Sequence, residues 1–352
     1  MPTAAPLTLE DIARRAGVSK MTVSFALRGH PHASPATRDR IRRLAKTMGY
    51  RPNPLVSANM AQLRAGRRSP YAGTIAFGGA GLPPQRSAID SQKRRVFFGA
   101  QRRAETLGYR LEWFALDHPA VDGHRQSGIL QARGILGVIL AANQVVPPRW
   151  HLAWEHFALA AIGRTEVGHE LHRTMGDYYR AVREICQRCR ARGYRRIGLA
   201  VSQEHDIAHQ SLHRSALLGC QAEWPRRDQV PALVAEPWAP GPFLQWVHRY
   251  QPDVVIASDD DPATWLKAEG YRVPKDIGLI RPHVNNKNLG IGGFVFDDAE
   301  VGAAAVDLIV EQLHHNERGV PSVVKRVLLP GRWFEGRSLR PAPKSAGAAT
   351  KS

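Results

Sequence analysis

The stretch "TLEDIARRAGVSKMTVSFALRG", residues 8–29, decides the fold of the N-terminal part of the chain. Thr8 stands before an apolar series and Asp11 follows three residues later, a pattern that caps the start of a helix. Gly17 is suited to a tight turn, and Ser19 is suited to capping a second short helix. Apolar residues at helical spacing predict an inward face made of Leu9, Ile12, Ala13, Ala16, Val23 and Leu27.

A third helix is predicted from "SPATRDR", with Ser34 as its cap and Pro35 as its first helical residue. Its inward residues are expected to be Ile41, Leu44, Ala45 and Met48, with Gly49 as the stop. Three short helices with a glycine turn between the first two describe a helix-turn-helix domain. Such a domain lays the start of its second helix in the major groove of DNA.

The second predicted helix carries two large apolar residues four positions apart, Met21 and Phe25. Because other residues already fill the inward face, both are predicted to face DNA, where they would contact thymine methyl groups. The alternative is that Phe25 packs against the third helix as core. Two basic side chains of the same segment, Lys20 and Arg28, are expected to reach guanine or phosphate.

The charge of the chain is unevenly placed. The net charge is +18, and residues 1–70 hold 13 Lys or Arg against Glu10, Asp11 and Asp39, a net of +10. A small basic domain on a less charged body indicates nucleic-acid binding, although a membrane surface or solubility would also explain it. The chain shows neither a secretory signal nor a run of 18 apolar residues, so a cytoplasmic protein is expected.

From Tyr71 onward, short apolar runs such as "GTIAF", "GVILAA", "RIGLAV" and "DVVIAS" alternate with helical patterns. This alternation predicts parallel sheets covered by helices. No GxGxxG opens a helix after the first run, so a dinucleotide site is not expected. Cys186 and Cys189 form a CxxC inside a helical stretch, and we interpret them as helix neighbours rather than a redox or metal site.

The sequence offers no convincing catalytic or metal-binding set. The acids of "SDDDP", residues 258–262, could hold Mg²⁺, but consecutive residues point in different directions and no phosphate-binding loop accompanies them. The 15 histidines are scattered and form no HExxH. We therefore expect no enzyme activity, no cofactor and no metal site.

The N-terminal segment resembles the headpiece of the lactose-repressor (LacI/GalR) family of bacterial transcription regulators. The resemblance rests on the "AxxAGVSxxTVS" run, the "S-x-x-T-R" start of the third helix and the closing "GYRPN", in register. It implies a hinge helix, at Pro54 to Arg64, that wedges an apolar side chain into the minor groove. The hinge residues singled out are Leu55, Met60 and Leu63. Alignment places Asn59 where the family has its intercalating Leu, so Met60 or Leu63 is expected to enter the minor groove instead.

The rest of the chain, to about residue 340, resembles the family's two-lobed α/β core of the periplasmic sugar-binding type. The resemblance is carried by "LHRTMGDYYRA", "GYRRIGL", "DVVIASDD", "VPKDIGLI" and "DDAEVGAAAVDLI". It implies an effector outside the carboxyl ends of the strands, held by Asp177, His213, Trp238, Asp259 and Asp297. All five positions carry open questions, and Trp238 could be an ordinary packing residue. His213 stands where the family usually has a ligand-binding Arg, and the acids could instead be helix caps or loop residues.

The expected organisation is a helix-turn-helix headpiece at 1–52, a hinge helix and linker at 53–70, a two-lobed core at 71–340 and a tail at 341–352. The expected mechanism is a homodimer on a near-palindromic operator, because one recognition helix offers too few base contacts. Repression controlled by a small ligand, at family level a carbohydrate, is the expected function. The alternatives are a regulator whose core answers to a protein or has lost ligand control, and a cytoplasmic solute-binding protein. The side chains expected to position the headpiece on phosphates are Thr8, Ser19, Thr22, Ser24 and Asn53.

Overall fold

The computed structural model describes residues 8–27, 33–48, 71–81, 83–86, 91–116, 123–141, 152–163, 168–258, 261–284 and 290–342. The chain divides into two units, one holding the N-terminal helices up to Ala72 and the other holding two β-sheets from Gly73 onward. Within these ranges, no helix is both long enough and apolar enough to cross a membrane.

The N-terminal unit, which we call the headpiece, contains helices α1 (Leu9–Ala16), α2 (Lys20–Leu27) and α3 (Pro35–Met48). The Thr8 hydroxyl accepts from the Asp11 backbone N–H at 3.3 Å, and the Asp11 carboxylate accepts from the Thr8 N–H at 2.9 Å. Gly17 ends α1 with a φ of 65°, a conformation that glycine adopts without strain. Ser19 caps α2 by accepting from the Thr22 N–H at 3.1 Å. The predicted caps and turn are therefore confirmed.

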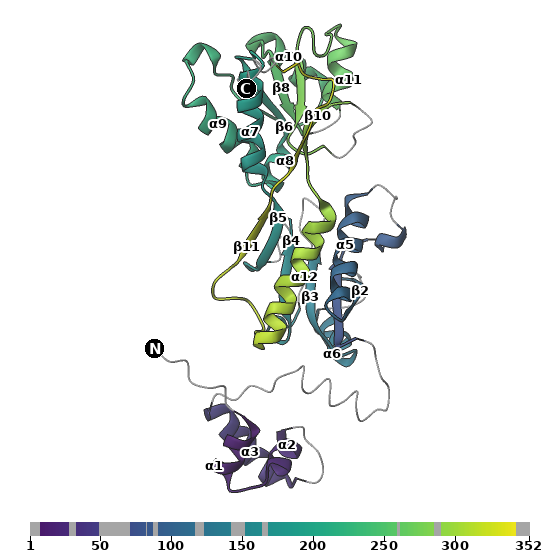
Figure 1. Cartoon of the computed structure of the whole chain (residues 1–352), viewed down its shortest axis with the longest axis vertical. Helices are drawn as coiled ribbons and strands as arrows, with labels where there is room; N and C mark the ends of the chain where they lie inside the picture. The colour runs from purple at the N-terminus through teal and green to yellow at the C-terminus, as the bar shows by residue number, and fades with distance from the viewer. Residues whose placement is uncertain are drawn as a thin grey trace, which may run out of the picture. The chain divides into compact units, whose positions relative to one another are not determined.

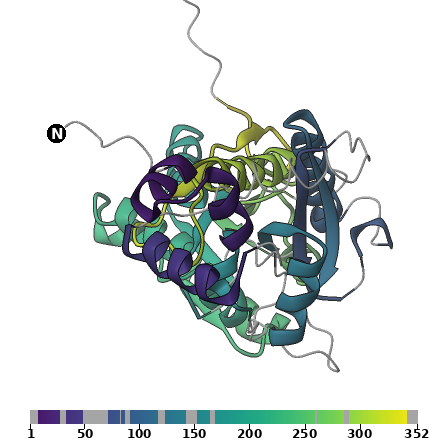
Figure 2. The same cartoon turned by 90° about the horizontal axis from the view of Figure 1, so that it is seen from below.

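The core of the headpiece is small and apolar. Ile12, Val23 and Ile41, one from each helix, are fully buried against one another. Ala26 is also fully buried, whereas Leu27, which was expected to point inward, is only partly covered. The three helices, purple in Figure 2, thus form the predicted helix-turn-helix arrangement.

The first lobe of the second unit is built on a parallel sheet with the strand order β11-β5-β4-β3-β1-β2. The strands are β1 (Gly73–Gly79), β2 (Tyr109–Ala115), β3 (Ile135–Ala141), β4 (Ala158–Ile162), β5 (His172–Gly176) and β11 (Arg326–Leu329). Its helices are α5 (Gln92–Thr106), α6 (Gly123–Ala132) and α12 (Asp298–His315), with short 3-10 turns at Pro84–Arg86 and Trp154–His156. Helices α5 and α12 cross so closely that a Cβ on Gly302 would lie 2.0 Å from the Val96 carbonyl oxygen.

The second lobe has a sheet of order β12-β10-β9-β8-β6-β7, parallel except for β12 against β10. The strands are β6 (Ile197–Ser202), β7 (Leu233–Ala235), β8 (Val254–Ala257), β9 (Gly278–Arg281), β10 (Gly292–Val295) and β12 (Arg332–Phe334). Around it lie α7 (Tyr178–Ala191), α8 (Gln203–Ala208), α9 (Leu212–Gln221), α10 (Pro240–Tyr250) and α11 (Asp261–Ala268), with a 3-10 turn at Arg226–Asp228. One apolar cluster joins α7 and α9 to the sheet and includes Cys186, Cys189 and Cys220, and another joins α10 and α11 to it.

The chain passes between the two lobes three times, from β5 to α7, from β10 to α12 and from β11 to β12 (Figure 1). The fold is therefore a helical headpiece followed by a two-lobed α/β core, as the sequence predicts. Strands β5, β11 and β12 and helix α8 were not identified in the sequence analysis. The three strands contain polar or charged residues that interrupt an apolar run, and α8 has only six residues, so none of them shows a clear hydrophobic period.

Candidate functional site

The outer surface of α2 carries the side chains that were predicted to read DNA. Met21 is 66% exposed, so it faces away from the headpiece core as predicted. Phe25 is half-buried and packs against that core. This favours the alternative that Phe25 is a core residue for the buried part of its ring. Lys20 is exposed and pairs with Glu10 at 3.5 Å. The start of α2 therefore presents one apolar and one basic side chain side by side.

The hydroxyl groups predicted to contact phosphates are partly engaged within the headpiece. Ser19 Oγ and Thr22 Oγ1 lie 2.8 Å apart, and Thr8 Oγ1 donates to the Asp11 carboxylate at 2.7 Å. Ser24 is half-buried on the same helix. Six further predicted residues lie outside the described residues, namely Arg28, Asn53, Leu55, Met60, Leu63 and Asp259.

Two of the acids predicted to bind an effector act as helix caps. Asp177 accepts from the Arg180 N–H at 3.1 Å at the start of α7. Asp297 accepts from the Ala299 N–H at 3.1 Å before α12, and its carboxylate lies 3.8 Å from Arg332. Both residues lie where the chain passes from one lobe to the other. A carboxylate has more lone pairs than a helix cap uses, so each could also accept a hydrogen bond from a ligand.

Trp238 lies within the apolar cluster of α10 and α11. Its ring packs against Trp265 at a centroid distance of 5.2 Å. Its Nε1 is buried, and the surrounding described residues supply no hydrogen-bond acceptor for it. The packing explains the position of the ring, and it leaves the indole N–H unsatisfied.

His213 belongs to a group that the sequence analysis missed. His205 at α8, His209 just after it and His213 in α9 place one ring nitrogen each within 4.8 Å of the other two. Their ring centroids lie 4.0 to 5.3 Å apart. We call these three residues the histidine cluster. The available signal was their spacing of four and four residues.

A break between α8 and α9 brings the histidine cluster together. Residues eight apart in one continuous helix would be separated by about 12 Å along its axis. Instead, Gln210 and Ser211 take left-handed conformations, with φ of 47° and 57°. The break is held by Asp206, whose carboxylate accepts from Ser211 Oγ at 2.9 Å and lies 3.0 Å from Arg214.

The histidine cluster lies at the carboxyl end of β6, where several other strands also end. Tyr178, at the start of α7, contacts His209, His213, His283 and Phe296, with ring centroids 4.9 to 5.9 Å away. His283 follows β9 and Phe296 follows β10. Tyr178, which follows Asp177, therefore contacts both His213 and Phe296, which precedes Asp297. These contacts lie at the edge where parallel sheets bind ligands.

The electrostatic state of this edge is set by burial. Burial, with the neighbouring His209 and Arg281, lowers the pKa of His205 to about 3. Burial also lowers the pKa of His283 to about 4. Both imidazoles are therefore neutral at neutral pH and keep a nitrogen lone pair available for bonding.

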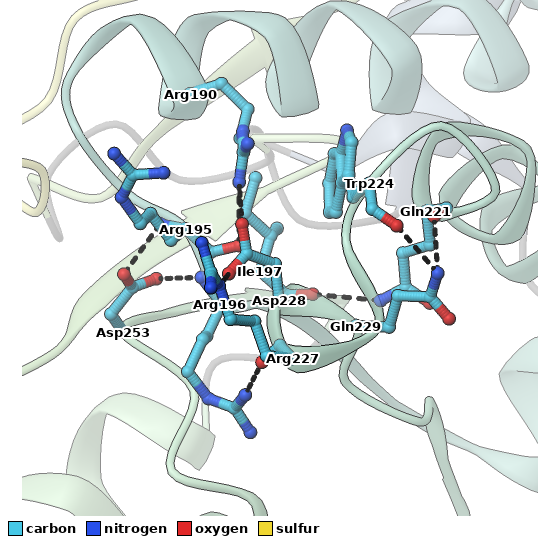
Figure 3. Close-up of polar contacts among 10 residues, drawn as sticks. All are labelled: Arg190, Arg195, Arg196, Ile197, Gln221, Trp224, Arg227, Asp228, Gln229 and Asp253. Carbon is cyan, nitrogen blue, oxygen red and sulfur yellow. Dashed lines mark hydrogen bonds and ion pairs between the residues drawn. The ribbon is translucent and has the colours of Figure 1, made fainter.

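The opposite end of the same sheet is occupied by a polar network (Figure 3). The Asp253 carboxylate accepts from the backbone N–H groups of Arg195 and Arg196 at 2.7 and 3.0 Å. Arg190 pairs with the buried Asp228 at 3.0 Å. Gln221 donates to the carbonyl groups of Ile197 and Val230, at 3.3 and 2.8 Å. These contacts fasten the starts of β6, β7 and β8 to α7 and α9.

Comparisons with known proteins agree with this arrangement. The sequence profile "Bacterial regulatory proteins, lacI family" matches residues 8–53, and the profile "Periplasmic binding protein-like domain" matches residues 186–339. The chain is 44% identical over 54 residues to the HTH-type transcriptional regulator AscG of Escherichia coli (strain K12). That match covers 15% of this chain and 16% of the relative.

Solved structures share the fold over nearly the whole chain. A transcriptional regulator CelR-cellobiose complex has a TM-score of 0.55 at 20% identity, covering 94% of this chain and 99% of that one. The lac repressor dimer bound to operator and the anti-inducer ONPF has a TM-score of 0.55 at 17% identity, covering 95% and 99%. At such identities the likeness concerns the fold.

A capped helix-turn-helix headpiece followed by a two-lobed, periplasmic-binding-protein-like core defines the class of protein. Residues 8–53 match the lacI family of bacterial regulatory proteins, and residues 186–339 match a periplasmic-binding-protein-like domain.

Proposed function

We propose that this chain is a sequence-specific DNA-binding transcriptional regulator that acts as a homodimer on a near-palindromic operator. The observation that carries the proposal is the start of α2. There the Ser19 cap fixes the helix and leaves Met21 exposed beside Lys20, on a headpiece that matches the lacI profile. An exposed apolar side chain next to a cation suits a groove that presents thymine methyls and phosphates.

In this proposal the core binds a small ligand and repression is the expected sign. His213 and Phe296 pack against Tyr178 at the carboxyl edge of the second sheet, where open α/β sheets bind ligands. Asp177 directly precedes Tyr178 and Asp297 directly follows Phe296 in the sequence. A carbohydrate is the class we propose, since the similar CelR structure is a complex with cellobiose. The hinge at 53–70 would pass the state of the core to the headpiece, with Met60 or Leu63 entering the minor groove.

A second candidate is a regulator whose core answers to a protein or has lost ligand control. Two observations favour it. A buried imidazole, His213, stands where the family usually has an arginine, and Asp177 and Asp297 are already used as helix caps. A ligand-dependent change in operator affinity would separate the first candidate from the second.

The test is selection of the purified full-length chain on random duplex DNA at near-physiological salt, with Met21→Ala and Phe25→Ala in parallel. We expect an enriched palindrome for the wild type. Met21→Ala should weaken binding about tenfold and relax one base preference, as expected when one base contact is lost. Phe25→Ala should also alter the preference, but its half-buried ring requires a check of the headpiece helices by circular dichroism.

Val323→Ala is the matched control, because Val323 is an apolar side chain of the core that is 76% exposed. It should leave the selected sequence unchanged. Weak, sequence-indifferent and steeply salt-dependent binding by the wild type would contradict the proposal and reduce the headpiece to a basic patch.

A further inference from the structure

The histidine cluster has the composition of a metal site that keeps an open coordination position. Its three potential donors are imidazole nitrogens, which suit zinc, copper, nickel and iron. A tetrahedral zinc ion with Zn–N bonds of about 2.0–2.1 Å separates its nitrogen ligands by about 3.3 Å. The ring nitrogens of His205, His209 and His213 already lie within 4.8 Å of one another, a gap that small side-chain rotations close.

We propose that His205, His209 and His213 bind one divalent first-row transition-metal ion through their ring nitrogens, with a fourth position open to a ligand. Metal binding by these residues does not depend on the proposed function. Only an effect of the metal on effector binding rests on that function. His213 is shared between the histidine cluster and the proposed effector site, so an ion in the cluster would lie at that site.

The hydrogen bonds of the cluster prepare its nitrogens for a metal. Nδ1 of His209 donates to the His205 carbonyl oxygen at 3.0 Å, because a carbonyl can only accept. The Nε2 atom of His209 therefore carries the lone pair, and a backbone carbonyl of this kind commonly orients metal-binding histidines. Nε2 of His205 is buried and has no hydrogen-bond partner among the residues described around it. A metal ion would satisfy this atom, whose desolvation is otherwise uncompensated.

The backbone of the cluster is also fixed in advance. Gln210 and Ser211 have left-handed backbone conformations, which are strained for residues with a Cβ. Such backbone strain is concentrated at functional sites. The Ser211 N–H donates to the Asp206 carbonyl oxygen at 2.8 Å, and Arg214 donates to Ser211 Oγ at 2.8 Å. These bonds hold α9 against α8 without using any histidine, so the three rings are presented together before an ion arrives.

The surroundings indicate what the fourth ligand would be. Arg281, which ends β9, is buried, donates to the Ser258 carbonyl oxygen and lies close enough to His205 to lower its pKa. A metal ion and this guanidinium would repel each other unless an anion lay between them. The open position is therefore suited to a carboxylate or phosphate oxygen. An ion with such a ligand would join α8 and α9 to β9, at the edge where the effector is proposed to bind.

The test measures metal binding to the untagged full-length chain after removal of metals with a chelator. Zn²⁺ is titrated by competition with a chromophoric chelator, and Co²⁺ is added separately because its visible absorption reports nitrogen ligands and tetrahedral geometry. We expect one ion per chain and a tetrahedral Co²⁺ spectrum. His209→Ala and His205→Gln should each weaken Zn²⁺ binding more than about 100-fold, since losing a ligand should exceed the effect of losing a neighbour that only orients one.

His248→Ala is the matched control, because this half-exposed histidine pairs with Glu269 at 3.4 Å and lies outside the cluster. His209 is half-buried, so its variant is expected to fold, and circular dichroism of both variants verifies this. Zn²⁺ binding that is equally weak in the wild type and the folded variants would overturn the proposal. Tight binding that survives both variants would place the ion elsewhere and would also overturn it. No DNA is used, so failure here and failure of the proposed function are distinguishable.

Discussion

The two ends of the second sheet differ in whether the buried polar side chains named below have hydrogen-bond partners. At the amino ends of the strands, Asp253, Asp228 and Gln221 each meet partners of complementary chemistry. At the carboxyl ends, His205 Nε2 and Ser258 Oγ are buried without a hydrogen-bond partner among the described residues. Buried polar groups are normally satisfied, so the unsatisfied ones at the carboxyl ends agree with the ligand site proposed there. The comparison contrasts a polar network that fastens the starts of the strands with the edge at which we propose that a ligand binds.

The largest expected effect comes from breaking the amino end. Gln221→Ala should lower the free energy of unfolding by about 3 kcal/mol, because it removes a buried side chain and leaves two carbonyl groups without a donor. Urea denaturation measures the change. Gln203→Ala, at an exposed site on α8, should cost less than about 0.5 kcal/mol. Equal losses for the two variants would contradict a special role of the network.

The pH dependence of the free energy of unfolding tests the buried histidines at the carboxyl end. In the metal-free protein the pKa of His205 is lowered from 6.5 to about 3, chiefly by burial. The unfolded chain therefore binds a proton below about pH 6.5 that the folded chain does not, so stability falls as the pH falls from about 6.5 towards 3. His205 should account for a loss of up to about 2 kcal/mol between pH 6.5 and 5, and His205→Leu should remove this share of the slope while His283 keeps its own.

The amino end should respond in a more acidic window. The hydrogen bond from Arg190 lowers the pKa of Asp228 below 3.8. The stability that this carboxylate contributes is present above its unfolded pKa and is lost only as the pH falls through its lower folded pKa. Asp228→Asn should therefore leave the slope between about pH 5 and 6.5 intact. Denaturation of both variants across this range checks the assignment, and a slope that follows Asp228 instead would refute it.

The smallest effect concerns the break between α8 and α9. Gln210→Gly should raise the stability by up to about 1 kcal/mol, because glycine adopts the left-handed conformation without strain. Thermal melting is the measurement. The same substitution at Gln203, the first residue of α8, should lower the stability by up to about 0.5 kcal/mol, because its backbone is already helical. Destabilisation at both positions would mean that the Gln210 side chain has a role beyond its backbone.

Much of the fold was predictable because it depends on local patterns. Thr8 with Asp11, Ser19 and Ser34 carry their capping function in residue type and spacing alone, and all three caps form as predicted. The long strands and helices of the core show their periods clearly. Helix α8 has only six residues, so no period could reveal it.

The candidate site was less predictable because its members depend on what surrounds them. Met21 is exposed as expected, whereas the half-buried position of Phe25 depends on how closely the headpiece helices pack. Asp177 and Asp297 were singled out as ligand contacts, and their positions before α7 and α12 make them caps as well. A cap and a ligand contact require the same residue type, so sequence does not distinguish them.

The sequence alone was enough to predict the helix-turn-helix headpiece and the alternation of strands and helices. These follow from caps, turns and hydrophobic periods, each read within a few residues. The histidine cluster, in contrast, was visible only in the tertiary structure. Spacing of four and four would carry His205 and His213 about 12 Å apart along a continuous helix. The left-handed break at Gln210 and Ser211, held by Asp206 and Arg214, instead brings their rings to 5.3 Å. Such a break depends on contacts and not on residue type, because neither residue is a glycine.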